Sequence, residues 1–409
     1  MKSSTVGLSI IALSTIAYVF VELLRSAYYT SQRDKKKTFW SRFICRNSRI
    51  PFIAFRVSLE PNLIKKQVKY VCKVLVPDWR HLEDAELRVE RVLGGITNRI
   101  FCVSVNKDAP NLFFNKVLVR VFGAEGIIDR EKENEIFEQL AKNRIAPSFI
   151  GEFANGRIES WLQARCISIE EMRYPNISKA VAQKLAILHR FQPQGHRKSL
   201  QDSPVWESIY AWLKEAKVAL KQLENTELDD SRRLLLKQID LLVLEKELEF
   251  LRNTLRKTPS PIVFSHNDLL FGNILYDEIS GTVHFVDFEY SGWNYRGFDI
   301  GNHFCECMGG TDNGIPDYTK YPTEEQQHLF CQHYLVSYGG FENVSSVNET
   351  DIKSLMIEAN RYALLSHFYW GMWALCLSVD QTVDFDYLLF GVNRFKEYYR
   401  FRNQFLEDP

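Results

Sequence analysis

The sequence predicts an α+β protein of two lobes, a small one with an antiparallel sheet and one helix, followed by a large and mostly helical one. Short β-branched runs separated by turn signals fill residues 93–163. From Ile169 onward, apolar residues recur at three- and four-residue steps, as in amphipathic helices. Polar residues cluster between two short strands in residues 264–289, inside the second part. The length of 409 residues accommodates both lobes.

Composition excludes several functional classes. Lysine plus arginine equals aspartate plus glutamate at 51 each, so the formal net charge is zero and no bulk electrostatic case for nucleic-acid binding exists. The eight cysteines form no CxxC motif, and no histidine–cysteine set has zinc-finger spacing. We therefore expect reduced, mostly buried thiols in a cytosolic protein.

The amino terminus carries an apolar segment. Residues 6–24 would span about 28 Å as a helix, close to the hydrocarbon thickness of a bilayer. A basic run in residues 25–49 follows, which by the positive-inside tendency leaves the rest of the chain in the cytosol. We expect a membrane anchor, with a cleaved signal or transit peptide and a simple leader as alternatives. Residues 1–50 are thus an anchor or leader plus a basic linker.

Residues 51–163 form the predicted small lobe. Residues 78–92 have helical spacing, and residues 93–105 are predicted as strand, glycine turn and strand. Gly94 and Gly95 would free backbone amides to approach a phosphate, although a plain hairpin turn is the alternative.

A strand over residues 116–122 contains Arg120, which needs an anionic partner there. The helix predicted for residues 129–143 offers Glu133 as that partner, with a solvated glutamate as the alternative. Two strands at 149–153 and 157–162 complete the sheet.

Residues 164–409 form the predicted large lobe. The expected helices cover residues 179–191, two or three long helices within 206–255, and residues 351–378 and 393–402. The leucine density of residues 206–255 resembles a coiled coil, but the heptad breaks near residues 225–230. These helices are interpreted as structural packing.

The polar cluster lies on a predicted hairpin, because residues 277–282 are a turn between two short strands. The hairpin brings together His266, Asp268, Asn273, Asp287 and Glu289. Carboxylates this close repel one another unless a cation lies between them. Oxygen-only ligands suit Mg²⁺ shared with phosphates and not zinc. The sequence therefore predicts phosphoryl transfer.

The spacing of His266, Asp268 and Asn273 is that of a protein-kinase catalytic loop, and Asp287 stands where D-F-G would begin. Asp268 would be the catalytic base, Asn273 and Asp287 would hold Mg²⁺ bridging the phosphates of ATP, and Glu289 would hold a second ion. His266 would brace the loop. The predicted fold is therefore protein-kinase-like, with ATP and Mg²⁺ as cofactors. A pseudokinase lacks support, because no site position looks lost.

The sequence departs from protein kinases after Glu289, where they carry glycine and later A-P-E. Residues 290–306 read YSGWNYRGFDIGNHFCE, and with GGITN at 94–98 and VLVR at 117–120 they closely resemble the choline/ethanolamine kinase family. The resemblance covers about residues 93–403.

The resemblance implies roles for individual residues. It implies Asp268 as base, Asn273 and Asp287 as metal ligands with Glu289 assisting, and Asp299 as an anchor of the catalytic loop. The nucleotide-binding set comprises Gly94, Gly95, Thr97, Asn98, Arg120 and Glu133. Asn302 and Glu306, one helical turn apart, would point into an amino-alcohol site. Trp370 and Trp373 would wall that site and hold an ammonium by cation–π attraction, although a core role is the alternative.

Local similarities favour ethanolamine over choline. Leu269 and Leu270, with residues 309–322 and 366–374, look like ethanolamine kinases, whereas residues 271–273 and 294–298 are closer to choline kinases. The expected reaction is phosphorylation of the hydroxyl of ethanolamine, the first step toward phosphatidylethanolamine. The alternatives are choline or dual specificity, another small-molecule phosphotransferase and a non-enzymatic membrane-tethered module. The sequence leaves the oligomeric state open, a dimer included.

Overall fold

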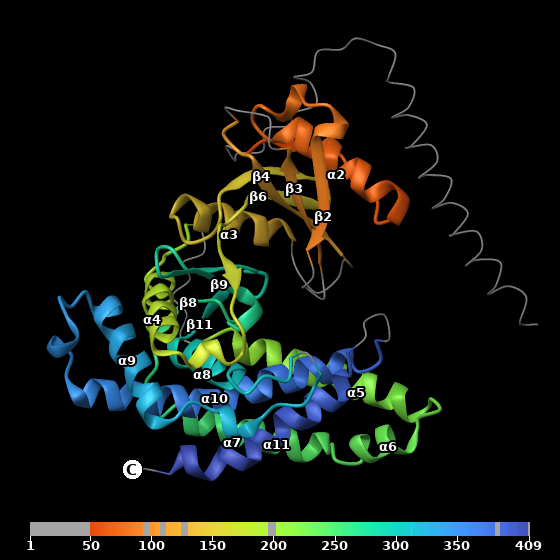
Figure 1. Cartoon of the computed structure of the whole chain (residues 1–409). Coiled ribbons are helices and arrows are strands. Elements are labelled where there is room, and N and C mark those ends of the chain that lie inside the picture. The colour runs from red at the N-terminus through yellow and green to blue at the C-terminus, as the bar shows by residue number, and fades with distance from the viewer. Residues whose placement is uncertain are drawn as a thin grey trace, which may run out of the picture.

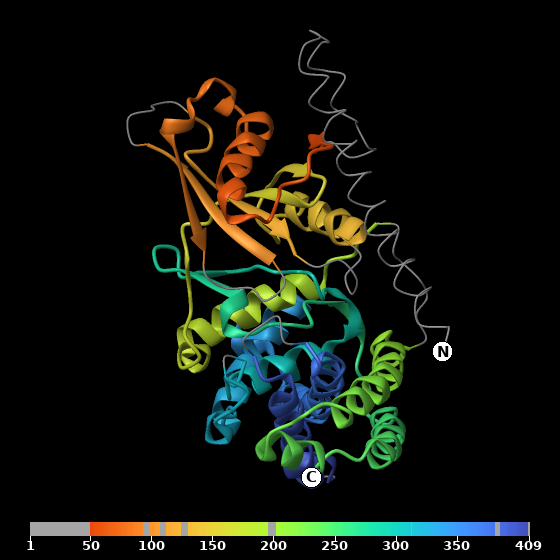
Figure 2. The same cartoon turned by 90° about the vertical axis from the view of Figure 1, so that its right-hand side faces the viewer.

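The computed structural model describes residues 50–92, 98–106, 112–123, 130–194, 202–311, 313–380 and 385–407. A sheet-containing lobe stands on a larger helical lobe, as two perpendicular views show (Figures 1 and 2). Across these residues, none of the helices is both long and apolar enough to cross a membrane. The anchor expected at residues 6–24 lies outside the described residues, as do Gly94, Gly95 and Thr97.

The small lobe holds a six-stranded sheet in the order β1-β5-β6-β4-β3-β2. Its strands are β1 (Phe52–Ile53), β2 (Leu87–Val92), β3 (Asn98–Val105), β4 (Lys116–Phe122), β5 (Phe149–Phe153) and β6 (Gly156–Ser160). Neighbours are antiparallel except β1, which pairs parallel with β5. The helix predicted over residues 78–92 was wrong. Two short 3-10 turns, Trp79–His81 and Asp84–Glu86, precede strand β2, in which Leu87 and Val89 alternate with exposed charged residues and bury one face of the strand.

Two helices cover this sheet, one more than predicted. Helix α2 (Pro61–Leu75) buries Ile64, Val68, Val71, Cys72 and Leu75. Helix α3 (Arg130–Lys142) is the one predicted over residues 129–143, and its apolar face contacts the large lobe. The Phe137 ring centroid lies 6.4 Å from that of Phe288. Helix α3 therefore joins the two lobes through a shared core.

The large lobe is built around the helix α10 (Glu349–Leu377), which packs against α5, α8, α9 and α11 (Figure 1). The other helices are α4 (Pro175–His189), α5 (Val205–Glu224), α6 (Asp230–Leu236), α7 (Leu241–Leu255), α8 (Arg296–Glu306), α9 (Glu324–Gly339) and α11 (Tyr387–Leu406). The expected helices are all present, although α11 begins six residues before the predicted start. Its first turn is capped by Asp386, which accepts a hydrogen bond from the Leu389 amide.

Short strands lie between the sheet lobe and the helices, where they position the polar cluster (Figure 1). Strands β9 (Ile274–Asp277) and β10 (Thr282–Phe285) form the predicted hairpin, to which β7 (Arg165–Cys166) adds a third strand. Strand β8 (Ile262–Ser265) pairs with β11 (Gly292–Tyr295). The Val286 amide donates to the Asn273 carbonyl over 3.1 Å, so the ends carrying Asn273 and Asp287 meet as expected.

Candidate active site

One buried carboxylate holds the loop that precedes Asp268 through hydrogen bonds to its backbone. Asp299, in the first turn of α8, accepts hydrogen bonds from the backbone amides of His266 (2.7 Å) and Asn267 (2.8 Å). The His189 Nε2 lies 3.0 Å from the same carboxylate, and its Nδ1 lies 2.7 Å from the Tyr334 hydroxyl. Burial alone would raise the pKa of Asp299, but the bonds from His189 and the loop amide hold it below its ordinary value. The expected anchor is thus present.

The loop has a strained turn where it leaves its anchor. Asn267 adopts a φ of 68°, in the left-handed region that asparagine tolerates better than most residues. Its side chain donates to the Tyr290 carbonyl (2.8 Å) and accepts from Asn294 Nδ2 (2.8 Å). The His266 ring bonds to the Val286 carbonyl over 3.0 Å, consistent with the bracing role expected for it. These bonds fix the backbone at Asp268.

Asp268 and Asn273 contact each other directly. The Asn273 Nδ2 donates to the Asp268 side chain (3.1 Å) and to its carbonyl (2.8 Å). Removal from solvent raises the pKa of Asp268 well above its ordinary value, and the charges of Glu306, Asp287 and Glu289 raise it further. The structure therefore brings the expected base together with carboxylates from three other sequence positions.

Arg120 reaches this group of acids from strand β4 of the small lobe. Its Nη1 lies 3.0 Å from the Asp287 Oδ1, and its Nε lies 3.2 Å from the Glu159 Oε1. The guanidinium is almost fully buried. Asp287 itself has a left-handed φ of 63°, which turns the chain as it leaves the hairpin.

The expected Arg120–Glu133 ion pair is not formed. Glu133 instead binds Arg157 Nη1 (2.6 Å) and Arg130 Nη1 (2.7 Å). The strand register explains why Glu133 has a different partner. Arg157 lies opposite Arg120 on the adjacent strand β6 and pairs with Glu133 of α3. Glu159 of β6 contacts both arginines. Glu133 therefore supports Arg120 through neighbouring residues and does not touch it.

Glu289 and Asn98 meet across the lobes. The Asn98 Nδ2 donates to Glu289 Oε2 over 3.3 Å, and the Arg130 Nη1 lies 3.1 Å from the same oxygen. Asn98 begins strand β3, and the preceding residues 93–97 lie outside the described part of the chain. Asn98, the described end of the expected nucleotide-binding segment, is thus adjacent to Glu289.

The donor set of this cluster fits a hard divalent cation. Asn273 uses its amide nitrogen toward Asp268, so its side-chain oxygen remains for another ligand. Asp287 and Glu289 add carboxylate oxygens, and oxygen donors are what Mg²⁺ prefers. Within the described ranges, no three histidine, cysteine or acidic side chains form a ready metal-binding group. Arg120 and Arg130 supply the positive charge beside these acids.

A second group of predicted residues assembles between α8 and α10. The Asn302 Oδ1 accepts hydrogen bonds from Trp370 Nε1 (2.9 Å) and Ser366 Oγ (2.7 Å). The Trp370 ring lies 5.3 Å from the Trp373 ring and 5.2 Å from the Tyr290 ring, both edge-on. The three rings form an aromatic wall next to the acids.

Glu306 completes this second group and is buried. The Arg394 Nη1 donates to its Oε1 over 3.1 Å. Burial raises the pKa of Glu306, and Arg394 opposes that rise. Sequence reasoning missed Tyr290, Ser366 and Arg394. Tyr290 directly follows Glu289 and Ser366 precedes Trp370 by one helical turn, so their spacing could have indicated them, whereas Arg394 had no such signal.

Lobes of this kind, with a catalytic loop and acidic hairpin beneath the sheet, define a protein-kinase-like phosphotransferase fold. Residues 89–399 match the family model for choline/ethanolamine kinase. The chain therefore belongs to the choline/ethanolamine kinase family.

Relatives and a solved structure agree with this assignment. Human ethanolamine kinase 2 is 33% identical over 86% of this chain and 84% of its own length. Human choline/ethanolamine kinase is 34% identical over 85% of this chain and 88% of its own. The solved structure of Plasmodium vivax ethanolamine kinase superposes with a TM-score of 0.69 at 27% identity, covering 85% of this chain and 91% of that one.

Proposed function

We propose that the protein transfers the γ-phosphoryl group of Mg²⁺·ATP to the hydroxyl of ethanolamine. The similarity to proteins named ethanolamine kinase supports the substrate. The observation that carries the proposal is a chain of contacts from the catalytic loop to the second group. Asn267, next to Asp268, donates to the Tyr290 carbonyl, and the Tyr290 ring packs against Trp370, which donates to Asn302. Glu306 lies one turn beyond Asn302 on α8. Asp268 would accept the hydroxyl proton while Glu306 holds the ammonium at the opposite end of a short amino alcohol.

The acids of the hairpin would serve the nucleotide end of the reaction. Asn273 and Asp287 would hold the metal, with Glu289 assisting, and the bound metal would neutralise charge on the phosphate oxygens. Arg120 pairs with Asp287 in this structure and would turn toward a phosphate when nucleotide binds. Asn98 and the preceding glycine turn would line the nucleotide, while Glu133 would support the site through Arg130.

Asp268 would orient the substrate hydroxyl and take its proton as the oxygen attacks the γ-phosphorus. Positioning matters most here, because phosphoryl transfer demands that the attacking and leaving oxygens lie in line. The Asn273 bond sets the angle of the carboxylate, and Asp299 holds the backbone before it. The product would be phosphoethanolamine, a precursor of phosphatidylethanolamine.

The aromatic wall and Glu306 would recognise the ammonium. Aromatic faces attract a cation by about 0.5–2 kcal/mol, and a buried carboxylate adds a charged acceptor. Trp370 is fixed by its bond to Asn302, and Tyr290 packs against its edge. Trp373 extends the wall along α10.

Dual specificity is the second candidate, because a relative named choline/ethanolamine kinase is as similar as those named ethanolamine kinase. Steady-state kinetics with each alcohol, on protein lacking residues 1–49, separates the two. The proposal expects a much higher kcat/KM for ethanolamine. Equal values would establish dual specificity, and turnover of neither alcohol would overturn the proposed function.

A further inference from the structure

One buried arginine connects the residues expected to recognise the amine. Arg394, on α11, donates from Nη1 to Glu306 Oε1 (3.1 Å) and from Nη2 to Ser366 Oγ (2.8 Å). The Ser366 hydroxyl donates a hydrogen bond to the Asn302 Oδ1 (2.7 Å), which also accepts one from Trp370 Nε1 (2.9 Å). The guanidinium thus links α11 to two other helices, α8 and α10, and Glu306 and Asn302 are one and two hydrogen bonds away from it.

The network leaves one acceptor unused. Glu306 Oε1 is taken by Arg394, whereas Glu306 Oε2 is buried without a hydrogen-bond partner in the structure. A buried acceptor in that state costs free energy that a donor recovers. The ammonium of ethanolamine carries three N–H donors, and the trimethylammonium of choline carries none. An unused, buried carboxylate oxygen in this network therefore favours a primary amine.

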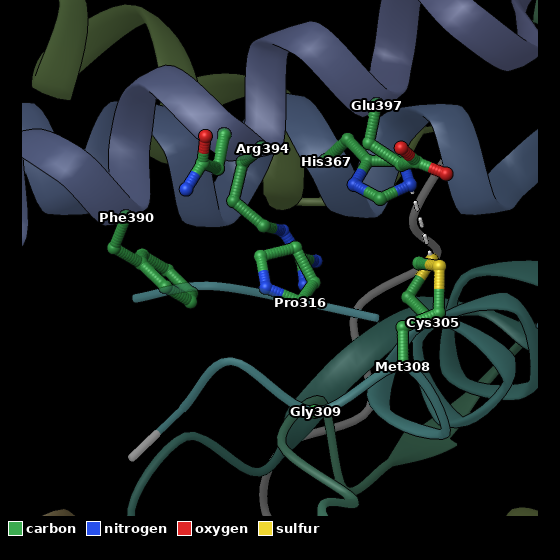
Figure 3. Close-up of a pocket in the computed structure, with 9 residues that line it drawn as sticks. Cys305, Met308, Gly309, Pro316, His367, Phe390, Arg394 and Glu397 are labelled. Carbon is green, nitrogen blue, oxygen red and sulfur yellow. Dashed lines mark hydrogen bonds between the residues drawn. The ribbon is translucent and has the colours of Figure 1, made fainter. Parts of the chain in front are cut away.

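Arg394 is held from the other side as well. It lines a small pocket with Cys305, Met308, Gly309, Pro316, His367, Phe390, Asn393 and Glu397. Figure 3 shows Arg394 and Glu397 on one wall of this pocket and Cys305 and Met308 on the opposite wall. The Phe390 ring centroid lies 5.7 Å from the Arg394 guanidinium carbon. Glu397 lies near enough for Arg394 to lower its pKa, but no hydrogen bond joins them in the described part of the chain.

The geometry requires an arginine and not merely a positive charge. Two nitrogens of one planar group reach acceptors on two different helices, Glu306 on α8 and Ser366 on α10. A lysine ammonium is a single point charge on a flexible stem and cannot hold both in one fixed arrangement. Charge balance alone would be satisfied by either residue.

We propose that Arg394 is a positioning and specificity-determining residue, which fixes Glu306 and Asn302 so that the free Glu306 oxygen receives the primary ammonium of the substrate. This inference rests on the proposed function. It adds that the amine site is set by a residue of α11, which touches no substrate atom itself.

The test compares Arg394→Lys and Ser366→Ala with wild-type protein and with Arg402→Lys, a control on the same helix whose guanidinium pairs with Glu247. Arg394→Lys is expected to raise the KM for ethanolamine by about tenfold or more, with kcat and the KM for ATP changed by less than about twofold. Ser366→Ala should raise the KM for ethanolamine by about three- to tenfold, because only the link to Asn302 is cut. Both variants should discriminate less between ethanolamine and choline, and Arg402→Lys should match wild type.

A pH profile separates positioning from support of the fold. The titratable and charged groups around the Glu306–Arg394 pair are Asp268, Cys305, Cys307, His367 and Glu397. In Arg394→Gln, Glu306 loses the cation that favours its ionised form, so the raised KM should fall again as the pH rises and Glu306 ionises without that cation. A residue that only supports the fold would give no such recovery.

The outcomes are distinguishable. An unchanged KM for ethanolamine in Arg394→Lys and Ser366→Ala, each folded by circular dichroism, would overturn the inference and leave the proposed function standing. Should Arg394→Lys not fold, Ser366→Ala alone decides, because it leaves the buried ion pair intact. A wild-type protein that turns over neither alcohol would overturn the proposed function and this inference together.

Discussion

The Arg120 guanidinium lies 3.0 Å from the Asp287 carboxylate and joins strand β4 of the small lobe to the acidic hairpin of the large lobe. The carboxylate proposed to hold a metal is therefore already paired with a cation. Burial opposes the charge of Arg120, but Asp287 and Glu159 raise its pKa, so it stays protonated throughout the working range. The pair balances charge at the site when nucleotide is absent.

Arg120→Lys should raise the KM for ATP by about tenfold or more, because lysine cannot contact Glu159 and a phosphate through a planar fork. Steady-state kinetics with varied ATP checks this. Arg88→Lys is the control, since Arg88 lies on the same sheet but its side chain is 70% exposed and pairs with Glu90. Equal KM values for the two variants would show that Arg120 does not contact nucleotide.

Asp268→Asn should lower kcat by about 10²–10⁴-fold while the protein still binds ATP, because only the proton acceptor is lost. The matched control is Asp277→Asn, in the exposed turn of the same hairpin, where asparagine can still accept from the Ile279 and Ser280 amides. Turnover and nucleotide binding measured on the same preparations check this. Retained turnover in Asp268→Asn would refute its role as base.

Sequence reasoning found the hairpin and its acids because they are local. The spacing from His266 to Asn273 lies within one loop, and β9 and β10 are joined by a short turn. The sequence did not predict the contacts between residues that are far apart in the chain. Arg394 meets Glu306 across 88 residues, and the choice of Glu159 over Glu133 as the partner of Arg120 depends on strand register.

Local propensity misled in the small lobe. Strand β1 has only two residues, Phe52 and Ile53, which pair with the edge of β5. Two residues are too few for a sequence pattern to predict such a pairing. Helix α2 was overlooked because its polar face interrupts the apolar residues, although Pro61 at its start is a recognised helix signal.

Gly301→Ala should destabilise the protein by about 1–3 kcal/mol or prevent folding. A Cβ at Gly301 would lie 2.4 Å from the Ala359 carbonyl oxygen, since α8 and α10 approach closely there. Gly292→Ala is the control, because a Cβ at Gly292 would meet nothing within 4 Å. Denaturant midpoints check the pair. Similar midpoints for both variants would mean that the helices separate at little cost.

Stability should depend on pH through Glu397. Burial raises its pKa from 4.5 to about 7, so the folded state retains a proton that the unfolded state has lost between these values, and stability falls as the pH rises through this window. Glu397→Gln removes that dependence. The loss of unfolding free energy from pH 5 to pH 8 should be about 1–2 kcal/mol smaller in the variant than in wild type. Urea titrations at both pH values check this, and parallel losses would contradict it.

Helix α8 carries Asp299, which suspends the catalytic loop, and Glu306, which is proposed to receive the ammonium, seven residues further on. At 1.5 Å per residue these two points lie about 10 Å apart along one rigid rod. We therefore expect the spacing between the catalytic loop and the proposed ammonium site to be set largely by this single helix. An amino alcohol with a third carbon would be too long for a site whose two ends are set by that one helix.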